Sequence, residues 1–219
     1  MSDASLRAAY SVWALGYDAF LGSTTSGARR RSVELLAPRA GERVLLVGVG
    51  TGLDLPHLPR HSGYAAVDLT PAMLRRAGRR ASRIGFPIAL TEGSATALPF
   101  EDEGCDAVIL HLILAVVPDP AAALREVARV LRPGGRAVVW DKMLREGRRP
   151  SPVRRALHAL THRYVTGFLF DLGAALGAAP ALRVTHREPS IFGGMWQIVL
   201  VEKTSAVGPQ PSAVRTSDG

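Results

Sequence analysis

The chain has 219 residues, of which 47% are hydrophobic and 21% charged, which favours a single soluble domain with a substantial core. Its one cysteine, Cys105, excludes an internal disulfide, and its longest apolar run, residues 107–117, is too short to span a bilayer. Because Asp3 and Arg7 precede any apolar run, we expect no signal peptide and a cytoplasmic location. The net charge of +8 is compatible with nucleic acid, anionic lipid or an acidic small molecule as partner.

The chain is predicted to begin with two helices. An apolar stripe at helical spacing runs through residues 5–22 and consists of Leu6, Tyr10, Trp13 and Tyr17. Residues 22–27, GSTTSG, have the composition of a loop. A second helix follows over residues 28–36 and ends before Pro38.

Strands and helices then alternate along the chain. The predicted strands cover residues 43–49, 64–69, 87–93, 105–112 and 136–141. The predicted helices lie in residues 70–85 and in residues 119–135, where Pro133 and two glycines stop the second helix. Thr70 and Pro71 have the residue types of a helix start, and Gly85 that of a helix end. Strands that alternate with helices indicate a parallel sheet with helices on both faces.

The last part of the domain has a different pattern. Strands are predicted at residues 181–188 and 195–203, and the short connection between them leaves no room for a crossover helix. This pair should therefore be antiparallel. Residues 204–219 are predicted to be a disordered tail, so residues 1–203 form the single domain.

Three glycines at alternate positions follow the first predicted strand. In an open parallel sheet, ligands bind beyond the carboxyl ends of the strands, where glycine lets the backbone approach a ligand closely. Gly48, Gly50 and Gly52 are followed by Asp68 at the end of the next strand. A carboxylate at that place can accept both hydroxyls of a ribose, so the pattern predicts a site for an adenosine-containing ligand.

Several segments together resemble the class I S-adenosylmethionine-dependent methyltransferases. They are VLLVGVGTG at residues 44–52, AAVDLTPAML at 65–74, EGSATALPFEDEGCDAVILHLILAVVPDP at 92–120 and ALREVARVLRPGGRAVV at 123–139. The resemblance covers residues 6–203. It implies an α/β, Rossmann-like, doubly wound sheet of seven strands, mostly parallel with an antiparallel C-terminal hairpin, and S-adenosyl-L-methionine as the cofactor.

The resemblance also assigns roles to residues. The cofactor-binding residues that it implies are Tyr17, Gly48, Gly50, Thr51, Gly52, Asp68, Leu69, Ser94, Ala95 and Leu110. Among these, the glycines would line the methionine and ribose portion, Asp68 would hold the ribose hydroxyls, and Leu69 would pack on the adenine. Ser94 and Ala95 would face the adenine amino edge.

Two positions depart from the family pattern. The family often has an acid at the position of Leu46 and an aspartate at the position of Ser94. Leu46 cannot make a carboxylate's water-mediated contact to the cofactor, and Ser94 offers only a neutral hydrogen bond, worth about 1 kcal/mol. These departures leave open a degenerate methyltransferase that binds without catalysing.

One titratable group is expected at the reaction site, because the sequence shows no acid–base dyad and no metal cluster. That group is His111, at the end of a predicted strand, which we predict to be catalytic. The alternative is a histidine satisfied by backbone groups. An amine acceptor attacks as the free base and demands little of the protein, whereas a phenol or carbon acid needs a base.

Within the family, the resemblance is greatest to bacterial phosphatidylethanolamine N-methyltransferases and to methyltransferases of quinone biosynthesis. It rests on YDAFLGSTTSGARRRSVELL at residues 17–36 and on IFGGMWQIVLVEK at 191–203. It implies that residues 1–37 form a helical lid that touches an anionic membrane, and that residues 142–180 form an acceptor-side insertion. A phospholipid amine is then the expected acceptor.

Alternatives to the lipid reading stay open. The acceptor could be an O, N or C atom of a small molecule in secondary or quinone metabolism. Arginines cluster at residues 28–31, 75–83 and 145–163, but a solvated arginine surface is the simpler interpretation of the first two clusters. RNA methylation is not favoured, because no RNA-binding module accompanies the charge.

Overall fold

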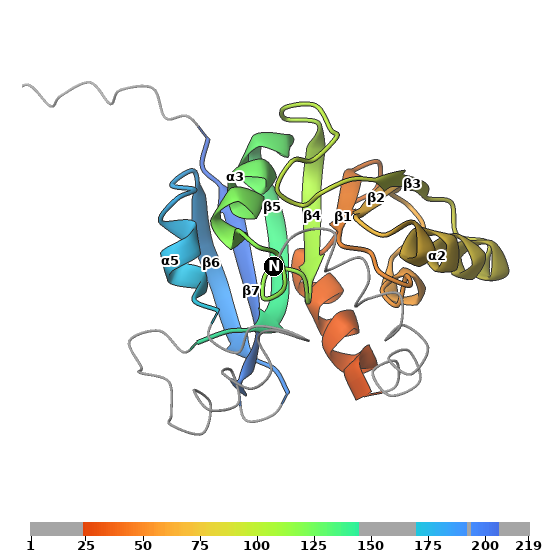
Figure 1. The fold of residues 1–219 in the computed structure, drawn as a ribbon, viewed down its shortest axis with the longest axis horizontal. Coiled ribbons are helices and arrows are strands. Elements are labelled where there is room, and N and C mark those ends of the chain that lie inside the picture. Colours follow the sequence, from red (N-terminus) through yellow and green to blue (C-terminus); the bar gives the residue numbers. More distant parts are fainter. Residues whose placement is uncertain (1–23, 145–169, 192–193, 206–219) are drawn as a thin grey trace, which may run out of the picture.

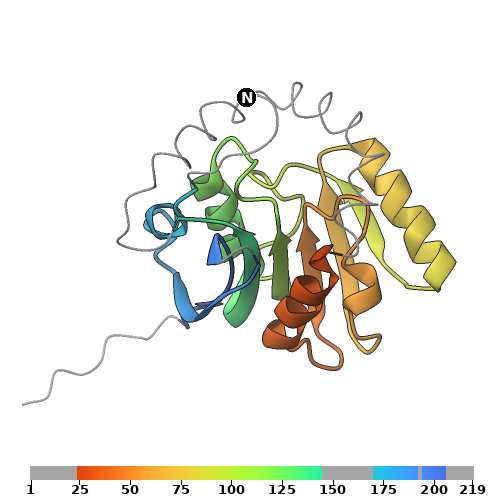
Figure 2. The same ribbon diagram turned by 90° about the horizontal axis from the view of Figure 1, so that it is seen from below.

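The computed structural model describes residues 24–144, 170–191 and 194–205, which form one seven-stranded sheet with helices on both faces (Figures 1 and 2). The sheet has the order β3-β2-β1-β4-β5-β7-β6. Its strands are β1 Arg43–Val47, β2 Gly63–Asp68, β3 Ala89–Glu92, β4 Cys105–His111, β5 Leu131–Lys142, β6 Leu182–Pro189 and β7 Trp196–Lys203. Neighbours from β3 to β5 are parallel, whereas β7 is antiparallel to both β5 and β6. The predicted fold class is confirmed.

β1 lies inside the sheet, between β2 and β4. Leu46 is in register with Ala66 of β2 and with Ile109 of β4. A strand that is paired on both edges and covered on both faces must be apolar throughout, and the last four residues of β1 are all buried. Since the strand order reverses at β1, its carboxyl end is the place where an open α/β sheet binds ligands.

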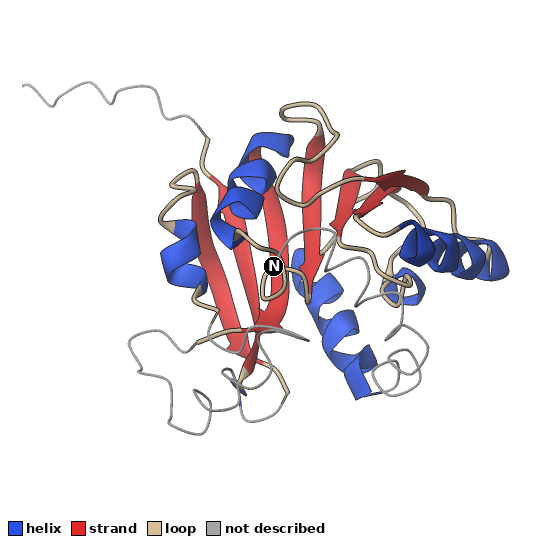
Figure 3. Ribbon diagram, in the orientation of Figure 1, coloured by secondary structure: helices blue, strands red, loops and turns tan. Residues whose placement is uncertain are grey.

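Helices cover both faces of this sheet, and Figure 3 distinguishes the strands, in red, from the helices, in blue. The described helices are residues 24–36, α2 Pro71–Ile84, α3 Pro120–Val130 and α5 Leu172–Leu176, with a single 3-10 turn, η1, at Leu55–His57. Leu36 and Ala77 belong to the core on the face that buries Leu46. Leu124 belongs to the core on the opposite face, which buries Leu45. The doubly wound arrangement follows from these two cores.

The predicted ends of α2 are confirmed. Pro71 occupies the first turn, and Gly85 follows the last residue with a φ of 61°, the left-handed conformation that glycine adopts without strain. Thr70 stands at the N-cap position, but its side chain makes no capping hydrogen bond. Its backbone N–H instead donates to the Asp68 carboxylate at 2.9 Å.

Two predicted boundaries were wrong. The expected loop at 22–27 overlaps a helix that already includes residue 24, where Arg29 donates to the hydroxyl of Thr25 one turn earlier at 3.2 Å. The helix that was expected to stop at Pro133 already ends at Val130, and residues 131–135 belong to β5. They form an irregular strand start, because the register between β4 and β5 shifts next to the glycine pair at 134–135.

Several predicted features lie outside the described residues. These are the helix at 5–22 with Tyr17, most of the predicted insertion at 142–180, and the tail from residue 206. Among the described helices, none has the length and apolar character needed to cross a bilayer.

Candidate functional site

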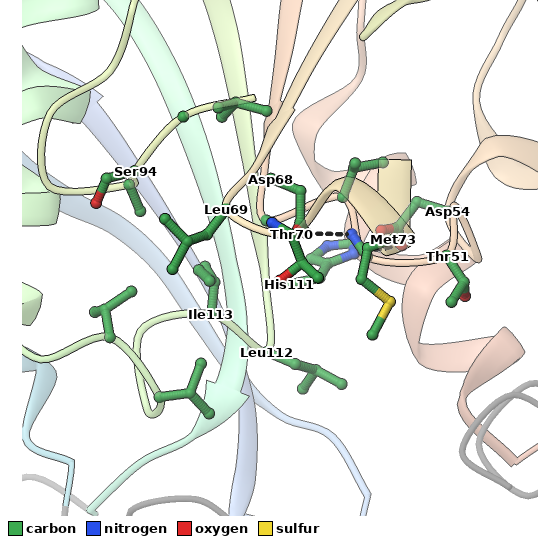
Figure 4. A pocket seen from close by; sticks show the side chains of 18 of the residues that line it. Thr51, Asp54, Asp68, Leu69, Thr70, Met73, Ser94, His111, Leu112 and Ile113 are labelled. Atoms are coloured by element: carbon green, nitrogen blue, oxygen red, sulfur yellow. Dashed lines mark hydrogen bonds and ion pairs between the residues drawn. The ribbon is translucent and has the colours of Figure 1, made fainter. Parts of the chain in front are cut away.

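A pocket opens at the carboxyl ends of β1, β2 and β4 (Figure 4). Its wall combines the glycine loop after β1, the start of α2, the loop after β3 and residues 111–118 after β4. In the view of Figure 4, Leu69 and Ser94 lie on one side, Thr51 and Asp54 lie on the other, and His111 lies between them. The predicted site residues therefore converge on one cavity, apart from those named below.

The glycine loop brings bare backbone to the pocket. A Cβ on Gly48 would lie 2.7 Å from the side chain of Ile113, and its φ of 72° is itself unfavourable for other residues. Gly50 and Thr51 line the pocket. Gly52 does not, and its role is packing, because a Cβ there would lie 3.2 Å from the Cα of Ala77 in α2.

Asp68 carries a fixed carboxylate at the pocket. One oxygen accepts the N–H of Gly50 at 2.8 Å, and the other accepts the N–H of Thr70 at 2.9 Å. Burial raises the pKa of Asp68, although these two hydrogen bonds and one from the Thr70 side chain oppose the rise. Each carboxylate oxygen can accept a second hydrogen bond. The group is therefore placed to receive two adjacent hydroxyls of a ligand.

The neighbouring wall is apolar with one small polar group. Leu69 and Ala95 line the pocket together with Ser94. The Ser94 hydroxyl lies 2.9 Å from that of Thr96 and accepts the N–H of Thr96 at 3.3 Å. This wall offers a flat ring system apolar contact and a hydroxyl at its edge.

Besides Gly52, two residues singled out in the sequence do not reach the pocket. Leu110 is fully buried in the core with Leu45, so its predicted contact with the cofactor is not supported. Leu112 and Ile113, which follow it, line the pocket instead. Leu46 is 1% exposed and belongs to the core on the other face, so the position that departs from the family pattern is a packing position here.

His111 belongs to a buried side-chain network. Its Nδ1 lies 2.7 Å from Oδ1 of Asp54, and its Nε2 lies 2.7 Å from the hydroxyl of Ser32. Arg29 donates to the same oxygen of Asp54 at 2.7 Å. The ring also meets Trp140 edge to face, with centroids 5.6 Å apart. His111 is therefore satisfied, but by side chains and not by the backbone.

The network keeps a negative charge inside the protein. Burial alone would favour the neutral acid, but the Arg29 guanidinium and His111 hold the pKa of Asp54 well below its usual range. Arg29 also lies over the ring of Trp140, 5.3 Å from its centroid. Sequence reasoning missed Asp54, Arg29 and Ser32. The available signal was an aspartate between two leucines directly after the glycines, because a buried carboxylate requires a partner.

A second buried carboxylate supports the pocket loop after β4. Asp141 accepts the N–H of Ala115 at 3.0 Å and the N–H of Lys142 at 2.7 Å. Burial raises the pKa of Asp141 to about 6, because desolvation outweighs these hydrogen bonds. Asp141 was also missed, since nothing in the sequence relates it to residue 115.

These features fit an adenosine-containing cofactor. The pocket offers a carboxylate with unused lone pairs, a glycine loop beside it and an apolar wall on the other side. Within the described residues, no three His, Cys, Asp or Glu side chains are grouped so that they could hold a metal ion.

Comparisons with known proteins agree with this geometry. Residues 45–139 match the methyltransferase domain family. The chain is 32% identical over 197 residues to phosphatidylethanolamine N-methyltransferase of Cereibacter sphaeroides, covering 89% of this chain and 95% of the relative. It is 33% identical over 198 residues to demethylmenaquinone methyltransferase of Mycobacterium sp. (strain KMS), covering 90% of this chain and 77% of the relative.

A solved structure has the same fold. The structure of geranyl diphosphate methyltransferase in complex with SAM is similar with a TM-score of 0.68 at 18% identity, over 82% of this chain and 85% of the other. The fold, the pocket and the relatives agree. The chain belongs to the class I S-adenosylmethionine-dependent methyltransferases, and S-adenosylmethionine is its cofactor.

Proposed function

We propose that this methyltransferase transfers the methyl group to the amine of a phospholipid such as phosphatidylethanolamine. The relative of that name from Cereibacter sphaeroides is matched over almost its whole length, which supports the proposal. The hydrogen bonds of the titratable side chains in the pocket wall also support an amine as the acceptor. A lipid acceptor implies that the chain works as a peripheral protein at the cytoplasmic face of a membrane.

Residue roles toward the cofactor are part of the proposal. Asp68 accepts the two ribose hydroxyls, because both of its oxygens are fixed by backbone N–H groups and keep unused lone pairs. Leu69 packs on the adenine, with Ser94 and Ala95 at its edge. The glycine loop, with Thr51, approaches the remainder of the cofactor. The role predicted for Tyr17 lies outside the described residues.

The proposal of an amine acceptor rests on one observation: the titratable side chains around the pocket already form hydrogen bonds within the protein. S-adenosylmethionine supplies a methyl group on a positive sulfur, which a nucleophile takes by in-line displacement. The titratable side chains of the described pocket wall are Arg29, Asp54, Asp68 and His111, and each is engaged by protein groups. An amine that arrives as the free base needs no base from the protein.

A quinone-type acceptor is the second candidate, because the demethylmenaquinone methyltransferase relative is matched at similar identity. Methylation at a ring carbon requires that a proton leave that carbon or the ring hydroxyl, and this favours a protein base. His111 could act as that base only by giving up its hydrogen bond to Ser32 or to Asp54. The engaged histidine therefore favours the amine.

The test is methyl transfer by the purified full-length protein from labelled S-adenosylmethionine. Acceptors are phosphatidylethanolamine in vesicles, its short-chain water-soluble form, and a demethylmenaquinol. We expect label in the lipid fraction as mono- and dimethylated products, and none with Asp68→Ala. Label that appears in the quinol alone would contradict the proposal.

His111 can be tested in the same assay. Replacement by Gln keeps one donor and one acceptor on the side chain, so amine methylation should continue with an unchanged pH profile. If His111 takes a proton from the acceptor, kcat should fall by about 100-fold or more and the limb of the profile near neutral pH should disappear. That result would restore the predicted catalytic role.

A further inference from the structure

The helix α2 carries an unusual concentration of positive charge. Five of its fourteen residues are arginine and none is acidic. Met73, Ala77 and Ala81 form its buried line, spaced four residues apart. The arginines on the opposite, exposed side have the same spacing and are Arg75, Arg79 and Arg83. We call these three residues the arginine ridge.

Several arginines elsewhere in the described chain are paired with carboxylates. In the cluster at 28–31, Arg29 pairs with Asp54 at 2.7 Å and Arg31 with Glu188 at 2.9 Å. On α3, Arg129 pairs with Glu126 at 2.7 Å. The ridge forms no ion pair with any of the residues that the structure describes. The ridge therefore differs from the cluster at 28–31, whose arginines pair with carboxylates.

An unneutralised row of this kind has a cost for the helix. Like charges four residues apart repel and destabilise a helix, and the ridge contains two such pairs in succession. At the end of α2, Arg60 donates to the carbonyl oxygens of Ile84 and Gly85 at 2.6 Å and adds another cation. Solubility alone would be served by arginine mixed with glutamate, as on α3. A row without acids suits an anionic partner surface.

The ridge begins beside the pocket. Thr70 and Met73, at the start of α2, line the pocket, and Arg75 lies within one helical turn of Met73. From Arg75 to Arg83 the helix advances roughly 12 Å. In Figures 1 and 2, α2 lies at the outer edge of the molecule, next to β2 and β3. The ridge therefore begins at the end of α2 that borders the pocket, on the side of the helix opposite Met73.

We infer that the arginine ridge docks the protein on an anionic lipid bilayer. The inference rests on the proposed function, because a phospholipid acceptor must be taken from a bilayer. A plane of lipid phosphates complements a straight row of cations, and the attraction should fall as salt is raised. Docking through the ridge keeps the end of α2 that borders the pocket at the bilayer surface.

The test compares two variants of the full-length protein that have the same net charge. The first is Arg75→Gln, Arg79→Gln, Arg83→Gln. The control removes three other exposed arginines on different elements, with Arg30→Gln, Arg125→Gln and Arg183→Gln. Binding is measured by co-sedimentation with vesicles of phosphatidylethanolamine and phosphatidylglycerol, at two salt concentrations, and circular dichroism checks that both variants fold.

We expect the ridge variant to bind these vesicles at least about tenfold more weakly than the unmodified protein, and the control to bind within a factor of about two. Equal binding by the ridge variant, or an equal loss in the control, would overturn the inference. So would tighter binding of tRNA than of vesicles that is lost in the ridge variant, since the ridge would then serve nucleic acid.

A second measurement separates this inference from the proposed function. With short-chain, water-soluble phosphatidylethanolamine as acceptor, the ridge variant should keep the kcat/KM of the unmodified protein, while its rate on vesicles falls. An unmodified protein that methylates neither form would overturn the proposed function. A ridge variant that loses activity equally on both forms would overturn the docking role alone.

Discussion

The two sides of the pocket are built in different ways. On the adenosine side, Asp68 is held by the backbone N–H groups of Gly50 and Thr70, which are 18 and 2 residues away in sequence. On the His111 side, side chains 57 and 79 residues apart hold the ring through Asp54 and Ser32. The first side is encoded by a local pattern, and the second exists only once the fold has brought distant residues together. The first should govern cofactor affinity, and the second the stability of the domain.

The largest effect is expected from Asp54→Ala, which breaks the His111 side. Removing this carboxylate leaves Arg29 buried beside His111 without a counter-charge, which typically costs about 3–5 kcal/mol of unfolding free energy. Denaturant unfolding measures the loss. As the matched control, Arg30→Ala removes an exposed ion pair with Glu34 at 3.6 Å and should cost less than about 1 kcal/mol.

The loss of unfolding free energy in Asp54→Ala should depend on pH. The pKa of Asp54 is lower in the folded protein than in the unfolded chain. Its stabilising contribution is therefore complete above the unfolded pKa of about 4 and is lost as the pH falls through the folded pKa. The difference between the unmodified protein and Asp54→Ala should shrink below about pH 4. A difference that stays constant would show that Asp54 acts through packing alone.

The next effect is expected from Asp68→Ala, which breaks the adenosine side. Losing a charged acceptor for two hydroxyls should weaken S-adenosylmethionine binding by about 100-fold or more, measured by calorimetry. Stability should change little, because burial already disfavours the ionised carboxylate. A large loss of stability with unchanged affinity would reverse the assignment of the two sides. The affinity of Asp68→Asn for S-adenosylmethionine should lie between those of the unmodified protein and Asp68→Ala, because Asn keeps one acceptor oxygen.

The difference between the locally encoded adenosine side and the His111 side, built from distant residues, also explains which features could be predicted from the sequence. The strands and the antiparallel final pair follow from periodicity and spacing over short stretches, and the structure confirms them. Gly48, Gly50 and Asp68, which spacing also singled out, line the pocket. Leu110 was misplaced, because it still lies inside β4, paired with Val47 and Val139, whereas the pocket begins at His111. Ser32, Arg29 and Asp141 carry no local signal. Their roles depend on which strand or helix lies beside them.

A third prediction concerns the other distant contact, between Asp141 and the pocket loop. Its folded pKa of about 6 lies above the unfolded value, so between about pH 4 and 6 the folded state binds more protons than the unfolded state. Asp141 therefore makes the protein less stable as the pH rises through that window, by up to about 3 kcal/mol. In Asp141→Asn this part of the pH dependence of Tm should be absent. An unchanged slope would mean that Asp141 does not titrate there.

The smallest effect is expected from Ser94→Asp, which strengthens the adenosine side. Ser94 offers a neutral oxygen where the family often has an aspartate, and a hydrogen bond to a charged acceptor is stronger than one to a neutral group. The gain should be about 1 kcal/mol, or about fivefold tighter binding of S-adenosylmethionine by calorimetry. Ser94 already contacts Thr96, so Thr96→Ala is the control for a local rearrangement. If Ser94→Asp leaves the affinity unchanged while Asp68→Ala abolishes it, the ribose end fixes the cofactor without help from the adenine edge. In that case a single local carboxylate carries the affinity of the whole adenosine side, and the departure at residue 94 costs this enzyme nothing.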